Sequence, residues 1–178
     1  AVAWGPSPLR VQFDASTSFH PKNLPFSYHW DFGDGQQSTE AAPSHTYIAS
    51  GSAPESFIAT LRLRDSLGIE AQREISVSLN NSPPQVVITS VRNGDLYPIT
   101  GYTSLPLRAA VSDAEHAAED LHYEWQTFLH HNAHFHPEPI DTLRETYTLI
   151  DPLGCDDELY YFRIRLEVSD PQGLRTQR

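Results

Sequence analysis

Several residue types are scarce in this chain, and each scarcity excludes a class of protein. Cys155 is the one cysteine among 178 residues, so no disulfide forms within the chain. No apolar run approaches the roughly 18 residues that a membrane-spanning helix needs, and we therefore expect no membrane insertion. Lysine and arginine number 12 against 23 acidic residues. The net charge of -11 makes nucleic acid and anionic membrane surfaces poor partners, because like charges repel.

The residues that are abundant favour β-structure. The 14 prolines oppose long helices, while recurring valine, isoleucine, tyrosine, phenylalanine and threonine are typical of strands. The opening residues, AVAWGPSPLR, are typical of the middle of a longer chain, so we expect a fragment of a larger protein. The strongly acidic charge fits a soluble exported protein, and we expect an extracellular or periplasmic location.

An internal repeat divides the chain in two. PLRVQFDAS at 8–16, YHW at 28–30 and LRLRDSLGIEAQ at 61–72 resemble, in the same order, PLRAAVSDA at 106–114, YEW at 123–125 and IRLEVSDPQGLRTQ at 164–177. The polar, proline-containing stretch NNSPP separates the two copies. We therefore predict a first domain at 1–79, a linker at 80–84 and a second domain at 85–178.

Within each copy apolar residues recur every second position. In the first copy Phe26, Tyr28 and Trp30 share one face, and in the second Ile164, Leu166 and Val168 alternate with charged residues. Such alternation, interrupted by turn residues, is typical of antiparallel sheets with one buried face. Several strands of this kind in about 90 residues predict a β-sandwich. We expect Trp30 and Trp125 to be buried on central strands.

The first copy resembles a PKD domain (polycystic kidney disease repeat). The resemblance rests on GPSPLRVQFDAS, YHWDFGDG, HTY at 45–47 and LRLRDSLG, and covers about residues 4–79. It implies an immunoglobulin-like sandwich that serves as a spacer or a binding module. The physical reading of WDFGDG is a turn rather than a catalytic site: Trp30 and Phe32 point into the core, and Gly33 and Gly35 accept positive φ.

The second copy resembles a module that accompanies a PKD domain in bacterial secreted glucose/sorbosone-dehydrogenase-like proteins. The resemblance rests on NSPPQVVITSVRNGDLY, AAVSDAEHAAEDLHYEW, FLHHNAHFHP and RIRLEVSDPQGL, and covers residues 80–178. It implies an accessory segment of a larger exported protein, whose catalytic propeller and quinone cofactor lie elsewhere. The whole chain is thus expected to be all-β, with two tandem immunoglobulin-like β-sandwich domains.

Four histidines fall within seven residues of the second copy: His130, His131, His134 and His136. Imidazole suits zinc or copper, so we predict a metal site here. If the strand continues, His130, His134 and His136 share a face; if Asn132 and the next residue form a two-residue hairpin turn, His131 joins His134 and His136 instead. The alternative to a metal site is a polar loop whose histidines bond to the backbone or to a sugar.

A second candidate site is acidic. Asp113, Glu115 and Asp120 precede the Trp125 strand, and Asp170 ends the last long strand. Carboxylates that converge repel one another unless a cation lies between them, so these four residues predict a calcium site. The alternative is a solvated acidic loop. A further acidic cluster, GCDDE at 154–158, is interpreted as a turn.

Three functions are compatible with these features. We expect a non-catalytic accessory segment that spaces, binds or anchors a larger protein, with the rest of that polypeptide and a carbohydrate or cell-surface protein as partners. A carbohydrate-binding module is the first alternative, with Tyr97, Tyr102 and Tyr161 as its aromatic residues. A small metal-dependent hydrolase built on three histidines and water is the second. No residue is assigned a catalytic role.

Overall fold

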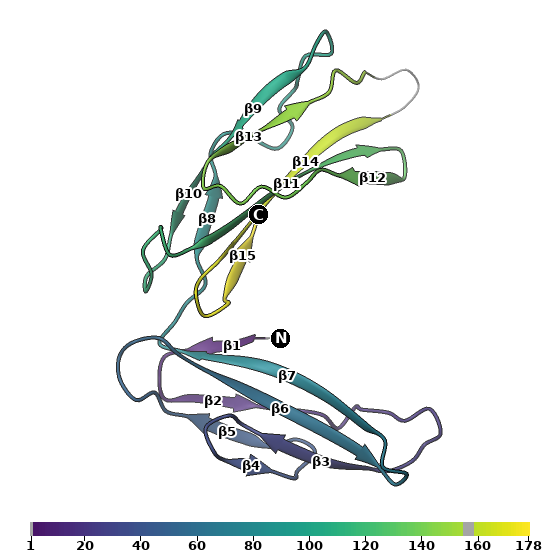
Figure 1. The fold of residues 1–178 in the computed structure, drawn as a ribbon, viewed down its shortest axis with the longest axis vertical. Coiled ribbons are helices and arrows are strands. Elements are labelled where there is room, and N and C mark those ends of the chain that lie inside the picture. Colours follow the sequence, from purple (N-terminus) through teal and green to yellow (C-terminus); the bar gives the residue numbers. More distant parts are fainter. Residues whose placement is uncertain (1, 155–158) are drawn as a thin grey trace. The chain divides into compact units, whose positions relative to one another are not determined.

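The chain folds entirely as β-strands and their connections in the residues that the computed structural model describes, 2–154 and 159–178. It divides into two compact units, Ala1–Ser82 (unit 1) and Pro83–Arg178 (unit 2) (Figure 1). The predicted all-β fold with sandwich units is confirmed. Most of the predicted GCDDE turn, residues 155–158, lies outside the described residues. No helix in the described ranges has the length and apolar character that a membrane crossing requires.

Unit 1 contains two sheets. One has the order β1-β7-β6-β3-β4 and the other pairs β2 with β5. Its strands are β1 (Val2–Gly5), β2 (Leu9–Gln12), β3 (Phe26–Asp31), β4 (Gln37–Ser38), β5 (Ser44–Tyr47), β6 (Glu55–Asp65) and β7 (Glu70–Leu79). The two longest strands, β6 and β7, form an antiparallel hairpin in the larger sheet (Figure 1). Strand β1 pairs with β7 in parallel. The predicted alternation is visible in β6, where alternate side chains are buried.

The core of unit 1 fills the space between these sheets. Trp30 and Phe32 are buried, as expected, and pack with Phe13 and Tyr47. The indole N–H of Trp30 donates to the Glu40 carbonyl at 3.1 Å, and so its polar atom is satisfied inside the core. This contact explains how a large aromatic ring with one polar group is buried without the cost of an unpaired donor.

WDFGDG forms the turn between β3 and β4. Gly33 and Gly35 have φ values of 81° and 88°, in the left-handed region that favours glycine. Asp31 and Asp34 accept the backbone N–H groups of Gly33 and Gln36. The interpretation of this motif as a structural corner is therefore consistent with its geometry.

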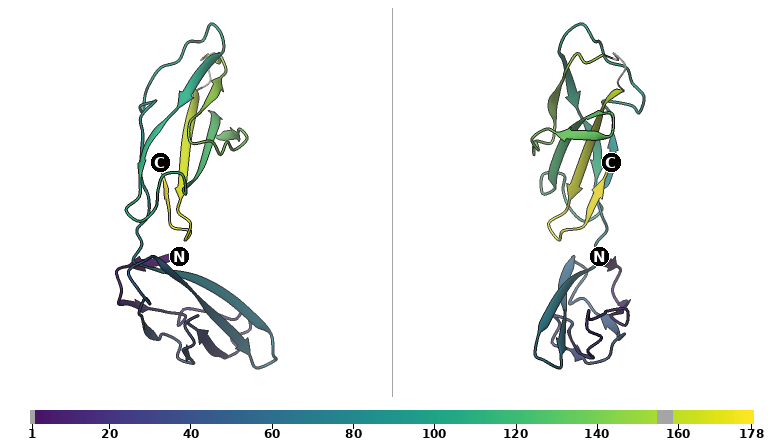
Figure 2. Two further views of the ribbon diagram at one scale, coloured as in Figure 1. Left: turned by 60° about the vertical axis from the view of Figure 1, so that its left-hand side comes forward. Right: turned by 90° about the vertical axis from the view of Figure 1, so that its right-hand side faces the viewer.

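Unit 2 also contains facing sheets. A four-stranded sheet has the order β12-β11-β14-β15, and two pairs, β10-β8 and β13-β9, lie opposite it (Figure 2). Its strands are β8 (Gln85–Ile88), β9 (Thr103–Leu107), β10 (Ala109–Ser112), β11 (His122–His131), β12 (His134–Pro137), β13 (Thr146–Ile150), β14 (Tyr160–Ser169) and β15 (Arg175–Gln177). Strands β11 and β14 pair along their whole length.

The core of unit 2 is concentrated in one half of the sandwich. Trp125 is buried, as expected, with Tyr123, Leu166 and Val168 around it. Toward the start of β14, before Leu166, the side chains are half-buried or exposed, and a cavity of about 830 Å³ opens between Ile164 and the opposite strands. One half of the unit is thus a packed core, while the other half contains the cavity.

Candidate functional site

The histidine run forms the end of the β11–β12 hairpin. Its turn has two residues, Asn132 and Ala133, and Asn132 has a φ of 50°. Asparagine tolerates this left-handed conformation better than most residues, so the sequence favours a turn here. The register pairs His131 with His134 and Leu129 with His136. Of the two arrangements left open by the sequence, the structure shows the hairpin.

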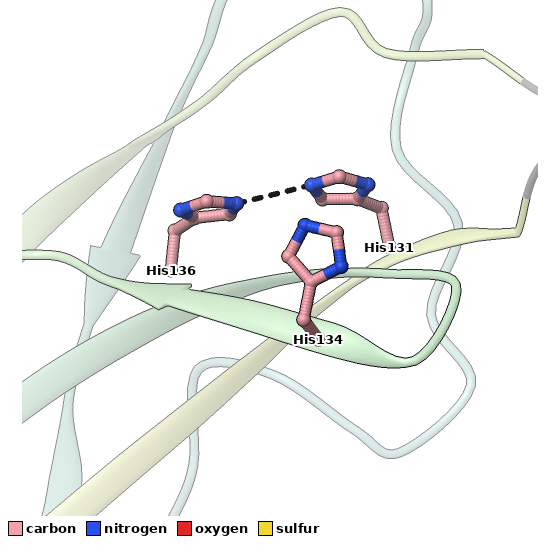
Figure 3. A group of neighbouring side chains, drawn as sticks. All are labelled: His131, His134 and His136. Atoms are coloured by element: carbon pink, nitrogen blue, oxygen red, sulfur yellow. Dashed lines mark hydrogen bonds between the residues drawn. The ribbon is translucent and has the colours of Figure 1, made fainter.

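Three imidazoles meet on one face of this hairpin. His131, His134 and His136 each offer a ring nitrogen, and these nitrogens lie within 4.8 Å of one another. Figure 3 shows the rings of His131 and His136 facing each other, with the His134 ring between them and one of its nitrogens directed toward the pair. His134 and His136 are exposed, and His131 is half-buried. The group is therefore open to solvent on one side.

The closest contact in this group joins His131 Nε2 to His136 Nε2 at 3.0 Å. One nitrogen must donate a proton and the other must accept it, so at least one of the two rings is neutral. Nitrogens bound to one tetrahedral zinc ion lie about 3.3 Å apart, given Zn–N bonds of about 2.0–2.1 Å. The spacing of His131 and His136 is thus close to that of two zinc ligands, and the His134 nitrogen lies within 4.8 Å of both.

No carboxylate joins the three histidines among the described residues. Glu138, the carboxylate that follows His136 by two residues, is exposed, and its backbone N–H donates to the Thr127 carbonyl. The donor set is therefore three imidazoles with one position left for water or for a group from another molecule. This set suits zinc or copper and not calcium, which prefers oxygen ligands.

His130 lies on the opposite face of the hairpin, away from the other three. Its ring stacks on Tyr161, with centroids 4.4 Å apart, and contacts Phe135. Burial and the positive charge of Arg163 hold the pKa of His130 below its ordinary value. The structure does not bring His130 into the cluster, because adjacent residues of a strand point to opposite faces.

The acidic segment of unit 2 forms a different cluster from the one expected. Asp113, His116 and Asp170 each place one ligand atom within 4.8 Å of the others. Asp113 Oδ1 accepts both the backbone N–H and the Nδ1 of His116, each at 2.9 Å. The Asp113 side chain is fully buried, and its Oδ2 has no hydrogen-bond partner in the described part of the chain.

Two expected members of the acidic site are not in this cluster. The backbone N–H of Glu115 donates to Asp113 Oδ1, and the backbone N–H of Asp120 donates to the Ala117 carbonyl. Of the four predicted carboxylates, the structure brings Asp113 and Asp170 together in this cluster, with His116, within the described residues. The sequence contains one signal for His116, which follows Asp113 by three residues. An aspartate at the start of a turn accepts hydrogen bonds from residues two or three positions later, so this spacing brings His116 close to the Asp113 carboxylate.

The cavity in the open half of unit 2 contains two of the three tyrosines that the sequence offers as aromatic residues for a sugar. Tyr97 and Tyr161 line it, with Arg92, Asp95 and Arg163 as polar neighbours. Tyr97 donates its hydroxyl to the Leu153 carbonyl and meets the ring of Phe162 edge-on. The third expected tyrosine, Tyr102, is 74% exposed and does not line the cavity. The three tyrosines therefore do not form one aromatic platform.

Comparison with known families identifies the first unit. Residues 6–79 match the model of the family described as the PKD domain. These residues coincide with the sandwich that carries the WDFGDG turn. Unit 1 therefore contains a PKD domain, as its motifs predicted, and the family match does not extend into unit 2.

Known proteins match a segment of similar length. Collagenase ColA of Bacillus cereus is 33% identical over 73 residues, which are 41% of this chain and 7% of the collagenase. The pre-pro-metalloprotease PrtV of Vibrio cholerae is 40% identical over 70 residues, which are 38% of this chain and 7% of that protein. The matched segment is thus a small part of each of these larger proteins.

Solved structures resemble the chain only weakly. Fibronectin(III)-like modules of CbhA from Clostridium thermocellum align over 100% of this chain and 86% of theirs, with 14% identity and a TM-score of 0.36. A structure from the β-sandwich superfamily of carbohydrate-binding modules aligns over 97% and 84%, with 12% identity and a TM-score of 0.35. These scores are too low to establish a common fold.

Proposed function

We propose that this chain is a non-catalytic accessory segment of a larger extracellular or periplasmic protein, and that unit 2 binds a transition-metal ion through His131, His134 and His136. The PKD match supports the accessory role, because the matched relatives carry that segment as 7% of their length and are named as a collagenase and a pre-pro-metalloprotease. The partner is then the rest of the parent polypeptide, together with the surface or carbohydrate on which that polypeptide acts.

The second unit is proposed to be the accessory module that occurs beside PKD domains in secreted glucose/sorbosone-dehydrogenase-like proteins. The motifs of residues 80–178, above all the histidine run, support this assignment. Its catalytic propeller would be a separate part of the same polypeptide. The test is deletion of this segment from the parent protein, which is expected to leave turnover of a small soluble substrate unchanged and to weaken attachment to an insoluble one.

The observation that carries the metal proposal is the convergence of three imidazoles on one hairpin face, with two Nε2 atoms 3.0 Å apart. The hairpin supplies this arrangement through its register, because paired residues and alternate residues of a strand share a face. A bound ion would replace the single proton between His131 and His136 and would use all three lone pairs. Water or a group from a partner would complete the coordination.

Titration calorimetry with zinc and with copper at pH 7.5, after treatment with a chelator, tests this site. Wild type is expected to bind one ion tightly at the three histidines, and His134→Ala and His136→Ala each to lose this binding. His130→Ala is the matched control, since His130 lies next to His131 in sequence and on the other face in space. Equal binding by wild type and by the His134→Ala/His136→Ala double variant at this site would contradict the proposal.

The cavity lined by Tyr97 and Tyr161 favours a second candidate function, a carbohydrate-binding module. Aromatic side chains beside Asp95 and Arg163 are typical of sugar sites. Tyr161 already stacks on His130, however, and only part of its ring remains for a sugar. A glycan array with wild type and Tyr97→Ala distinguishes the two roles: a carbohydrate-binding module retains glycans through Tyr97, whereas a spacer retains none.

A metal-dependent hydrolase is less well supported by the geometry. The described residues place no carboxylate in the three-histidine group to act as a general base toward a metal-bound water. Zinc-loaded protein is therefore expected to show no hydrolysis above that of the His134→Ala/His136→Ala variant across peptide, ester and phosphodiester substrates.

A further inference from the structure

The cluster of Asp113, His116 and Asp170 has features of a second ligand site, separate from the histidine hairpin. Asp113 follows β10, His116 lies in the turn after it, and Asp170 follows β14. We infer that these three side chains bind a divalent transition-metal ion, with zinc as the best match. This site does not depend on the histidine hairpin, and it goes beyond the function proposed above.

Burial is the first argument for a ligand. The Asp113 side chain has an exposed fraction of 0%, that of His116 is 10%, and Asp170 is 5% exposed. Asp113 Oδ2 is buried without a hydrogen-bond partner in the described part of the chain. Leaving a carboxylate oxygen buried and unpaired is costly, so an atom that compensates it is expected at this position.

Charge is the second argument. Asp113 and Asp170 are both buried, and one ligand atom of each lies within 4.8 Å of the other and of His116. Carboxylates this close repel one another unless a proton or a cation compensates them. A divalent ion bound to both aspartates neutralises both charges and uses Asp113 Oδ2, which has no hydrogen-bond partner in the described part of the chain.

The identity of the donors selects the class of metal. Calcium and magnesium take oxygen ligands almost exclusively, whereas an imidazole beside two carboxylates is a typical donor set for zinc and related ions. The ligand atoms already lie within 4.8 Å of one another, and closing on an ion with bonds of about 2.0–2.2 Å requires small side-chain movements. His116 thus changes the expected ion from calcium to a transition metal.

Unit 1 contains a natural control for this cluster. Asp65, the last residue of β6, begins the same kind of turn as Asp170, and His20 Nε2 lies 3.3 Å from Asp65 Oδ2. The aspartate that corresponds to Asp113 by its turn, Asp14, is exposed and caps Ser16. Asp65 Oδ2, like Asp113 Oδ2, has no hydrogen bond among the described residues, but His20 has one buried aspartate beside it and no second carboxylate in a cluster, so we expect no metal there.

The test uses the full chain carrying His134→Ala and His136→Ala, so that the hairpin site contributes nothing. Equilibrium dialysis against zinc is expected to find one bound ion, and either Asp113→Asn or His116→Gln is expected to abolish it. At a free zinc concentration 100 times the dissociation constant, the unfolding temperature of unit 2 is expected to rise by about 10 °C. His20→Gln, in unit 1, is the matched control and is expected to keep the bound ion.

The alternatives give distinct outcomes. Binding of calcium with no binding of zinc would overturn the inference in favour of a site built from oxygen ligands. Binding of neither ion, with Asp113→Asn less stable in chelator, would mean that the cluster is a structural hydrogen-bonded pair only. Stoichiometry is measured on folded protein, so His116→Gln decides the question if Asp113→Asn does not fold. Failure of the hairpin site leaves this experiment unaffected.

Discussion

Unit 1 and unit 2 share a strand pattern and use it differently. In both, an aspartate after a long strand begins the same turn: Asp65 Oδ1 accepts the N–H of Ile69, and Asp170 Oδ1 accepts the N–H of Leu174, each four residues on. Both turns contain a glycine with a φ of 85°. These contacts hold the end of the sheet, and they are therefore part of the common scaffold rather than of a function.

The differences lie in what surrounds this scaffold. The core tryptophan of unit 1 is satisfied, since the Trp30 indole N–H donates to the Glu40 carbonyl, whereas the Trp125 indole N–H is buried without a hydrogen-bond partner among the described residues. Unit 2 also lengthens the hairpin after its core tryptophan and opens a cavity in one half of the sandwich. The comparison teaches that one strand pattern accommodates different turns and different packing around its core tryptophan.

The core tryptophans give the largest expected effect. Trp30→Ala is expected to lower the free energy of unfolding of unit 1 by about 3–5 kcal/mol and Trp125→Ala to do the same for unit 2, because each leaves a large cavity in its own core. Scanning calorimetry is expected to resolve two transitions, each variant shifting only one. A single transition that moves with either substitution would contradict two separate folding units.

The second largest expected effect is the stabilisation of unit 2, and not of unit 1, by zinc. At 100 times its dissociation constant, a ligand that binds only the folded state adds about 2.7 kcal/mol, and this gain should fall on the unit 2 transition alone. The Asp113→Asn/His134→Ala/His136→Ala variant removes ligands from both clusters and should lose the gain. An equal shift of the unit 1 transition would show that zinc acts nonspecifically on the acidic chain.

The WDFGDG turn provides a comparison within unit 1. A side chain at Gly33 would place its Cβ 2.6 Å from the Ile58 carbonyl oxygen, and the φ of 81° is strained for other residues. Gly35 has a similar φ but no neighbour within 4 Å. Gly33→Ala is therefore expected to cost about 2–3 kcal/mol and Gly35→Ala about 1 kcal/mol, measured by urea unfolding. Equal costs would show that φ alone limits this turn.

The smallest effect concerns pH and the contact of Asp34 with His45. Burial acts to raise the pKa of Asp34, but hydrogen bonds from the His45 ring at 2.7 Å and from Gln36, with the His45 charge, hold it below its ordinary value. A lowered folded pKa adds stability above the unfolded pKa of about 3.9, and this stability is lost as pH falls through the folded pKa. Unit 1 should therefore weaken below about pH 4.

Asp34→Asn isolates this contribution. The variant is expected to cost about 1–2 kcal/mol near neutral pH, through the weaker hydrogen bond to His45, and to flatten the decline below about pH 4. Glu40→Gln, at an exposed carboxylate of the same unit, is the control for general charge effects. An unchanged pH profile in Asp34→Asn would show that other carboxylates cause the acid sensitivity.

Most of the fold could be predicted from the periodicity of the strands and from the residues of the turns. The alternation in residues 26–30 and 164–168 predicted which side chains face the core, because a strand has only two faces and one of them meets the core. The WDFGDG turn was readable for the same reason: glycine at positive φ and aspartate as a cap are local effects. Asn132 likewise made a hairpin one of two arrangements consistent with the sequence.

The sequence by itself determined an all-β chain with an internal repeat, two core tryptophans and the choice of His134 with His136, since period-two alternation depends only on neighbouring residues. Tertiary structure decided that His131 and not His130 completes that group, because the hairpin register is set by pairing across strands. It also decided that His116, and neither Glu115 nor Asp120, joins Asp113 and Asp170. That cluster unites the ends of β10 and β14, and no local pattern specifies which side chains of two distant turns share one buried space.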